Sequence, residues 1–272
     1  MTSHEITRIL ENLFPAGLAV EGDATGVQID CDDREVVSIG IAYELTDRIV
    51  GEICSSGTGY VIVFHPLIYR PLGSISPEDR VGRAVLELVS AGVTLFVTHT
   101  RLDAHPDGTN TSLARALGAE SGTPLVPLTA VELPDSSGMG RLASFANGIS
   151  WSELIERVRQ VTRSEGLRAS PIASDRRIEK VAIVAGSGMS YYDAACRAGA
   201  DVMITGDVRY HDFHAANDRI PIIDPGHAES EAFVLDATGT ILNAGIMLPN
   251  MQVVRFATAT TPLRYLPSGT TD

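Results

Sequence analysis

Short apolar runs alternate along the chain with segments of helical periodicity. Buried strands are predicted over 36–43, 60–64 and 93–97. Helices are predicted over 3–14, 46–54, 76–91 and from 111 to 117, with Ser3 and Ser76 as N-caps and Pro77 at a first helical position. This alternation of strands and helices indicates an α/β fold with parallel strand pairs.

The middle of the chain has weaker signals. Residues 119–149 are rich in Gly, Ser and Pro, whereas 149–164 has the pattern of an amphipathic helix with Ser150 as its N-cap. Residues 165–177 read as a linker. We expect a single unit over 1–272 made of two lobes, with a boundary within 120–175. Lobe 1 covers about 1–130 plus a C-terminal segment, and lobe 2 covers about 131–245.

The second half of the chain resembles the first at one fixed offset. Residues 34–70 align without gaps on 176–212, so that Cys54 falls on Cys196 and Gly57 on Gly199. Both segments read strand, helix, Gly, strand and then a polar residue. An internal duplication would explain this match, although any two strand–helix–strand units share some of it. If the lobes are related, a site in the cleft between them would draw residues from both.

The composition narrows the classes of protein. A net charge of −13 argues against binding nucleic acid through its phosphates or sitting on an anionic membrane. The three cysteines are scattered and form no CxxC motif, which favours a reducing compartment. No apolar stretch approaches the roughly 20 residues that span a bilayer, and the first residues do not resemble a signal peptide. We therefore expect a cytoplasmic protein.

Histidines and carboxylates stand at positions that suit a metal site. His65 and His99 each come directly after a predicted strand, and Asp103 follows His99 by four residues. His227 and Glu231 are also four residues apart, so that on a helix both would project from one face. Imidazole and carboxylate together ligate Zn²⁺, Mn²⁺, Fe²⁺ or Co²⁺. A single histidine after a strand is more often structural, so the combination of segments carries this prediction.

A glycine-rich segment, AGSGMS over 185–190, lies between a predicted strand and a helix. Its backbone N–H groups could receive an anion. Because the segment lacks a complete GxGxxG motif and a phosphate-binding lysine, a tight turn is the favoured interpretation.

Together these residues resemble the NIF-three-like family, whose members carry the label GTP cyclohydrolase 1 type 2. The resemblance runs over nearly the whole chain. It rests on GVQID at 26–30, VIVFHPLIYRP at 61–71, THTRLDAHPDGTN at 98–110, GMGRLA at 138–143, VAIVAGSG at 181–188, ADVMITGDVRYHDF at 200–213 and IDPGHAESE at 223–231. It implies an α/β fold of two similar lobes, a ring-shaped homohexamer and a two-metal centre in the cleft, in the short form of the family without an inserted domain.

The resemblance also implies a set of ligands. His65 and Asp103 would serve one metal, His227 the second, and Glu231 both. The family has a further histidine, serving the second metal, at the position of Phe64. Phenylalanine has no lone pair to donate, so we expect one firmly held divalent ion per chain and a second site that is empty or weak.

The leading functional hypothesis is metal-dependent hydrolysis of a small nucleotide-like or phosphorylated substrate, with His99 as a candidate proton shuttle. The alternative is a non-catalytic metal-binding or regulatory oligomer, which the loss of a ligand at Phe64 favours. In either case the expected assembly is a homo-oligomer, most simply a hexamer.

Overall fold

A computed structural model describes residues 1–245, 251–258 and 260–265. The chain divides into two compact units, each assembled from several segments. The first unit comprises Met1–Gly108, Thr129–Asp135 and Val234–Thr260, and the second comprises Thr109–Leu128, Ser136–Phe233 and Thr261–Asp272. Each unit is an α/β structure built around its own sheet, as the alternation of strands and helices predicted.

The first unit contains a five-stranded sheet in the order β1-β4-β3-β2-β13. Its strands are β1 (Gly26–Ile29), β2 (Ser38–Ala42), β3 (Tyr60–Val63), β4 (Thr94–Val97) and β13 (Gln252–Phe256). All neighbours are parallel except β1, which pairs antiparallel with β4. Its helices are α1 (Ser3–Leu13), η1 (Ala16–Leu18), α2 (Asp47–Ser56), α3 (Arg80–Ser90), α4 (Thr100–Ala104) and α10 (Val234–Gly245).

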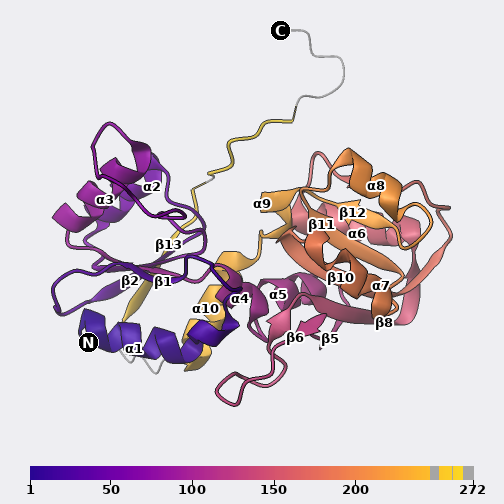
Figure 1. Ribbon diagram of the computed structural model, residues 1–272, viewed down its shortest axis with the longest axis horizontal. Coiled ribbons are helices and arrows are strands. Elements are labelled where there is room, and N and C mark those ends of the chain that lie inside the picture. The colour runs from indigo at the N-terminus through magenta and orange to yellow at the C-terminus, as the bar shows by residue number, and fades with distance from the viewer. Residues whose placement is uncertain (246–250, 259, 266–272) are drawn as a thin grey trace, which may run out of the picture. The chain divides into compact units, whose positions relative to one another are not determined.

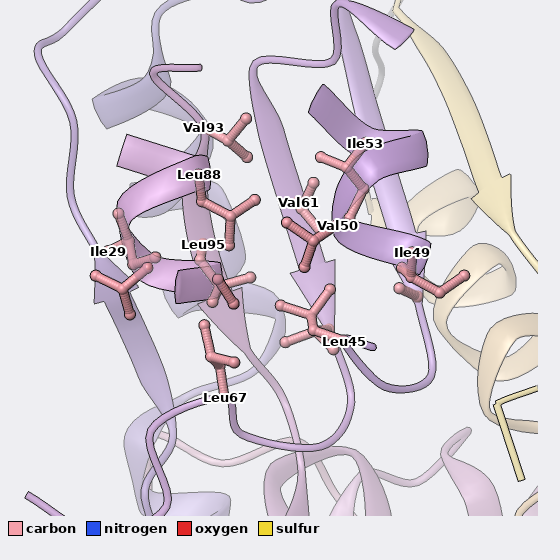
Figure 2. Close-up of a cluster of buried hydrophobic side chains, with 14 of the residues drawn as sticks. Ile29, Leu45, Ile49, Val50, Ile53, Val61, Leu67, Leu88, Val93 and Leu95 are labelled. Atoms are coloured by element: carbon pink, nitrogen blue, oxygen red, sulfur yellow. The ribbon is translucent and has the colours of Figure 1, made fainter. Parts of the chain in front are cut away.

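Helices cover both faces of this first sheet (Figure 1). Apolar residues of α1 and α10 pack on one face, against side chains such as Ile39, Ile41 and Ile62. Helices α2 and α3 pack on the other face against Val61 and Leu95, and Figure 2 shows this second cluster. Strands β2, β3 and β4 are buried on both faces, which explains why they appear in the sequence as nearly continuous apolar runs.

The second unit contains a six-stranded sheet in the order β5-β8-β10-β11-β12-β9, together with a small β6-β7 pair. Its strands are β5 (Glu120–Thr123), β6 (Val126–Pro127), β7 (Gly138–Met139), β8 (Arg141–Ser150), β9 (Arg168–Ala169), β10 (Arg177–Ser187), β11 (Val202–Gly206) and β12 (Ile222–Asp224). Its helices are α5 (Thr109–Ala116), α6 (Trp151–Thr162), η2 (Met189–Tyr191), α7 (Tyr192–Arg197), α8 (Tyr210–Ala216) and α9 (His227–Ser230).

The second sheet is also covered on both faces. Helices α5 and α6 pack on one face, where Leu113 and Leu154 meet Val181 and Ile204. Helix α7 packs on the other face, where Ala195 joins a cluster with residues of β10, β11 and β12. Strands β10, β11 and β12 are parallel, so their carboxyl ends lie at the same edge of the sheet.

Several predicted boundaries were wrong for local reasons. Helix α1 is capped by the hydroxyl of Thr2 rather than by Ser3. Helix α3 begins at Arg80 rather than at 76, because the Asp79 carboxylate accepts the N–H of Gly82 and caps the helix there. Residues 165–177 are more than a linker, since they include β9, which pairs antiparallel with β12. The cap at Ser150 is confirmed, because its Oγ accepts the N–H of Glu153.

The alignment of residues 34–70 on 176–212 also matches the way that the strands pair in the two units. In the first unit Ile39 pairs with Tyr60 and Ile41 with Ile62. In the second unit the residues aligned with these four pair in the same way, Val181 with Val202 and Ile183 with Ile204. Both pairs of strands are parallel and are joined through a helix. Over the described residues, no helix is both long enough and apolar enough to cross a membrane.

Candidate functional site

His65 and His99 lie side by side at the carboxyl edge of the first sheet. Strand β3 ends at Val63 and β4 at Val97, and backbone hydrogen bonds continue beyond both ends. The N–H of His65 donates to the carbonyl of Tyr43 at 3.0 Å, and the N–H of His99 donates to that of Phe64 at 3.1 Å. The two imidazole ring centres are 5.6 Å apart. The prediction that each of these histidines follows a strand is confirmed, and the two strands are parallel neighbours.

A buried carboxylate orients His99. Its Nδ1 lies 2.8 Å from both carboxylate oxygens of Asp23, whose side chain is 6% exposed. Thr100 also donates to Asp23 through its hydroxyl and its backbone N–H. Burial raises the pKa of Asp23, but the hydrogen bonds from His99 and Thr100 outweigh it and hold that pKa below its usual value. The contact with Asp23 through Nδ1 fixes the orientation of the His99 ring.

The backbone at His99 is strained. Its φ of 36° lies in the left-handed region that non-glycine residues rarely adopt, and His99 stands at the N-cap position of α4. Such strain persists where surrounding contacts determine the conformation, and it clusters at functional sites. Here the contacts of His99 with Asp23 and Phe64 determine it.

Phe64 is part of a packed ring cluster. Its side chain is 1% exposed, and it stacks on Tyr43 with ring centres 6.0 Å apart. The rings of His65 and His99 meet it at 4.9 and 5.6 Å. The position is therefore filled by an apolar ring that supports both histidines and has no donor atom for a metal.

Asp103 lies within α4, one turn after His99, and is 7% exposed. A carboxylate that is buried to this degree needs an opposite charge, hydrogen-bond donors or a metal ion to offset the cost of leaving water. Its burial is compatible with the role that the resemblance implies, and that role stays a prediction.

In the second unit, His227 and Glu231 form a contact pair at the carboxyl edge of the sheet. His227 opens α9, which follows β12, and Glu231 is the C-cap of this helix. His227 Nε2 lies 3.3 Å from Glu231 Oε2, and the glutamate side chain is 4% exposed. The spacing of four residues therefore brings both side chains to one face, as predicted.

A second carboxylate, on Asp207, holds the other nitrogen of His227. Asp207 comes directly after β11, and its Oδ2 lies 2.7 Å from His227 Nδ1. The hydrogen bond with Glu231, opposed by burial and supported by Asp207, raises the pKa of His227 to about 9. The imidazole is thus placed between two carboxylates, one buried and one 52% exposed.

The end of β11 approaches the backbone of α9 closely. A Cβ on Gly206 would lie 2.8 Å from the Cα of His227, so a side chain at this position would push the two elements apart. Glycine therefore lets Asp207, the next residue, reach His227.

Sequence reasoning missed the roles of Asp23 and Asp207. Asp23 is 76 residues from His99 and lies in a loop, where spacing gives no signal. Asp207 could have been found, because the alignment of the two halves places it on His65, the strand-end residue of the first unit.

The chain carries a donor set that could hold a metal ion. Two imidazoles and one carboxylate make up this group: His65, His227 and Glu231. Imidazole nitrogen and carboxylate oxygen suit Zn²⁺, Mn²⁺, Fe²⁺ and Co²⁺ alike, so the donor types do not select one metal.

Comparison with known proteins identifies the family. The family model for Duf34/NIF3 (NGG1p interacting factor 3) matches residues 1–262. The chain belongs to the Duf34/NIF3 family. The resemblance noted from the HP, HTRLD, TGD and GHAESE segments is confirmed.

Relatives of this Duf34/NIF3 chain are found in bacteria and fungi. A protein of Streptococcus pneumoniae named GTP cyclohydrolase 1 type 2 homolog is 31% identical, over 86% of this chain and 88% of the relative. A protein of Schizosaccharomyces pombe named Protein NIF3 homolog is 27% identical, over 84% of each. The fold matches the crystal structure of Staphylococcus aureus hypothetical protein SA1388 with a TM-score of 0.88 at 23% identity, covering 98% of this chain and 99% of that one.

Proposed function

We propose that the protein binds a divalent metal ion through His65, His227 and Glu231, with Asp103 as a further ligand. One observation carries this proposal: His227 engages Asp207 with one ring nitrogen and turns the other toward the buried carboxylate of Glu231. Metal-ligating histidines characteristically have a carboxylate on the second nitrogen, which fixes the tautomer and the ring orientation.

The residues fit a metal ion by their chemistry. Glu231 is a buried carboxylate, and a cation beside it would offset its desolvation. Imidazole ligands favour first-row divalent ions over the harder Ca²⁺ and Mg²⁺, which prefer oxygen ligands alone. The ion would supply Lewis acidity, by which it would polarise a substrate oxygen.

We propose one firmly held ion per chain. The apolar Phe64 occupies the position where the family carries another histidine, and its buried ring has no donor atom for a metal. With His227 on the first ion, a second ion would retain only the shared Glu231, fewer than the three protein ligands of a typical catalytic zinc site.

The reaction that these residues support best is hydrolysis of a small nucleotide-like or phosphorylated substrate. The names of the relatives suggest a nucleotide as the substrate. The proposed metal ligands do not distinguish GTP from other nucleotides. His99 would move the proton through Nε2, because Asp23 fixes its ring through Nδ1. His65 and Glu231 would hold the metal and would not take part in this proton transfer.

The second candidate is a metal-binding regulatory protein without catalysis, and the apolar ring at Phe64 favours it. Either function would use a closed homo-oligomer, which we propose to be a hexamer. Light scattering should then give a mass near six times the 28.9 kDa of one chain. A stable monomer at micromolar concentration would contradict this assembly.

The decisive experiment compares two isosteric changes on neighbouring residues. Glu231→Gln removes the proposed anionic ligand, whereas Glu229→Gln makes the same change within α9 at a residue outside the proposed ligand set. Elemental analysis should show metal lost from the first variant and kept by the second. Turnover of a nucleotide and phosphoester panel that disappears with a chelator and with Asp103→Ala would support the enzyme. Bound metal without turnover would support the regulatory protein.

We also propose that the two units descend from one strand–helix–strand ancestor. Residues that align between the two halves of the sequence also pair in the same register in the two sheets, which supports this origin. It makes His65 and Asp207 equivalent strand-end residues, one a proposed ligand and the other a partner of a proposed ligand.

A further inference from the structure

The glycine-rich segment Ala185–Gly188 interrupts the pairing of β10 with β11. The register shifts between Ile183 and Ser187, so the strand bulges at this point. Gly186 has a φ of 66°, in the left-handed region that favours glycine. Bulges of this kind often re-aim groups beside functional sites.

Side chains from three other elements hold this bulged segment. The N–H of Ala185 donates to Asn110 Oδ1, that of Gly186 to Ser230 Oγ, and that of Gly188 to Thr205 Oγ1, each at 2.8 Å. All three hydrogen bonds are buried. These N–H groups are therefore engaged inside the protein, and they do not form the anion-receiving loop considered from the sequence.

The backbone of Gly186 lies directly against the carboxylate of Glu231. A Cβ at this position would meet Glu231 Oε1 at 2.4 Å and His227 Cε1 at 3.5 Å. Because the obstructed atom is the end of a flexible side chain, a methyl group here would displace the carboxylate rather than the fold.

Ser230 links the segment to α9. Its Oγ accepts the N–H of Gly186 and donates to the carbonyl of His227 at 2.7 Å. One hydroxyl therefore links the bulge to α9, the helix that begins at His227 and is capped by Glu231.

We propose that the bulge at Ala185–Gly188 is a positioning element for the Glu231 carboxylate, with Gly186 and Ser230 as positioning residues. Because Gly186 has no side chain, there is room for the carboxylate to face His227 Nε2. Ser230 connects the bulge to α9 through its two hydrogen bonds. The link to metal binding rests on the proposed function, whereas the steric relation between Gly186 and Glu231 does not.

The first test is made without metal and uses a matched glycine. Gly199 has nearly the same φ, 71°, but a Cβ there would meet nothing within 4 Å. Gly186→Ala and Gly199→Ala therefore share the backbone strain, and only the former crowds Glu231. Gly186→Ala should lower Tm by about 3 °C more than Gly199→Ala. In a Glu231→Ala background this excess should vanish. An equal excess in both backgrounds, or no excess, would overturn the proposal.

The second test adds Mn²⁺ to the same proteins. Gly186→Ala should weaken Mn²⁺ binding about 10- to 100-fold, the range seen when partners of metal ligands are removed, and Gly199→Ala should leave it unchanged. Undiminished binding by Gly186→Ala would refute the positioning role. If the wild type binds no Mn²⁺ while the metal-free coupling is present, the proposed function fails and the steric inference stands.

Ser230→Ala keeps the test decisive if Gly186→Ala does not fold. It removes the linking hydroxyl and should also weaken Mn²⁺ binding at least about tenfold. Its control is Ser3→Ala in α1, which removes another buried hydroxyl, one that donates to Asp33. Equal Mn²⁺ affinity of the two serine variants would argue against the link.

Discussion

Metal binding should be coupled to the release of a proton from His227. Between Glu231 and Asp207 the pKa of this imidazole is raised to about 9, so at pH 7 nearly every metal-free molecule carries the imidazolium. A metal ion requires the neutral ring, and it therefore has to displace this proton. With a pKa about two units above the working pH, the apparent affinity at pH 7 is about 100-fold below its limit at high pH.

This prediction can be measured by calorimetry with Mn²⁺. The apparent affinity should rise about tenfold from pH 7 to pH 8, and titrations in buffers of different ionisation enthalpy should show release of about one proton. Asp207→Asn removes one of the two carboxylates and should reduce this pH dependence. Asp212→Asn, in α8, is the matched control and should leave it unchanged. Equal affinity at the two pH values, with no proton released, would refute the reasoning.

The raised pKa of His227 has an opposite consequence for the metal-free fold. A folded-state pKa above the unfolded value stabilises the protein at low pH, and this contribution is lost as the pH rises. It is complete below about pH 6.5 and disappears as the pH passes through about 9. The Tm of the metal-free wild type should fall over this window, and it should fall less in Asp207→Asn.

Three further predictions concern the first unit. Arg101→Ala should destabilise the fold by about 2 kcal/mol in urea unfolding, because this guanidinium is 6% exposed and donates to the buried carbonyl of Phe14 and to the Thr25 hydroxyl. The exposed Arg159→Ala should change stability by less than about 0.5 kcal/mol, and similar losses would contradict the argument. Phe64→His should add a second Mn²⁺ binding event in calorimetry, whereas two tight events in the wild type would disprove the one-metal proposal. The pKa of Asp23 lies below its usual value, so its contribution is present above about pH 4 and lost at lower pH. The Tm difference between wild type and Asp23→Asn should therefore be larger at pH 6 than at pH 3, and a constant difference would show that the contact with His99 contributes no charge effect.

The sequence predicted the fold where one physical signal was dominant. Strands β2, β3 and β4 are buried on both faces, so their residues form apolar runs that few other structures would produce. The strand-end placement of His65 and His99 followed from these runs. The start of α3 was misplaced because Ser76 and Pro77 form a good capping signal, while Asp79 makes the hydrogen bond that begins the helix.

Partners that are distant in sequence could not be predicted. Asp23 binds His99 across 76 residues, and this contact depends on how the loop before β1 folds over the sheet edge. Asp207 reaches His227 because Gly206 allows two backbones to approach, a requirement that spacing does not reveal. The contact between His227 and Glu231 could be predicted because the two residues lie about one helical turn apart in the sequence.

The most direct test of the proposed metal centre is a crystal structure of the protein with Mn²⁺, with anomalous data that locate the ion. We expect one strong anomalous peak per chain, within about 2.3 Å of a donor atom of each of His65, His227 and Glu231. A crystal that contains Mn²⁺ with no peak at these residues, or with its strongest peak elsewhere, would contradict the proposed centre.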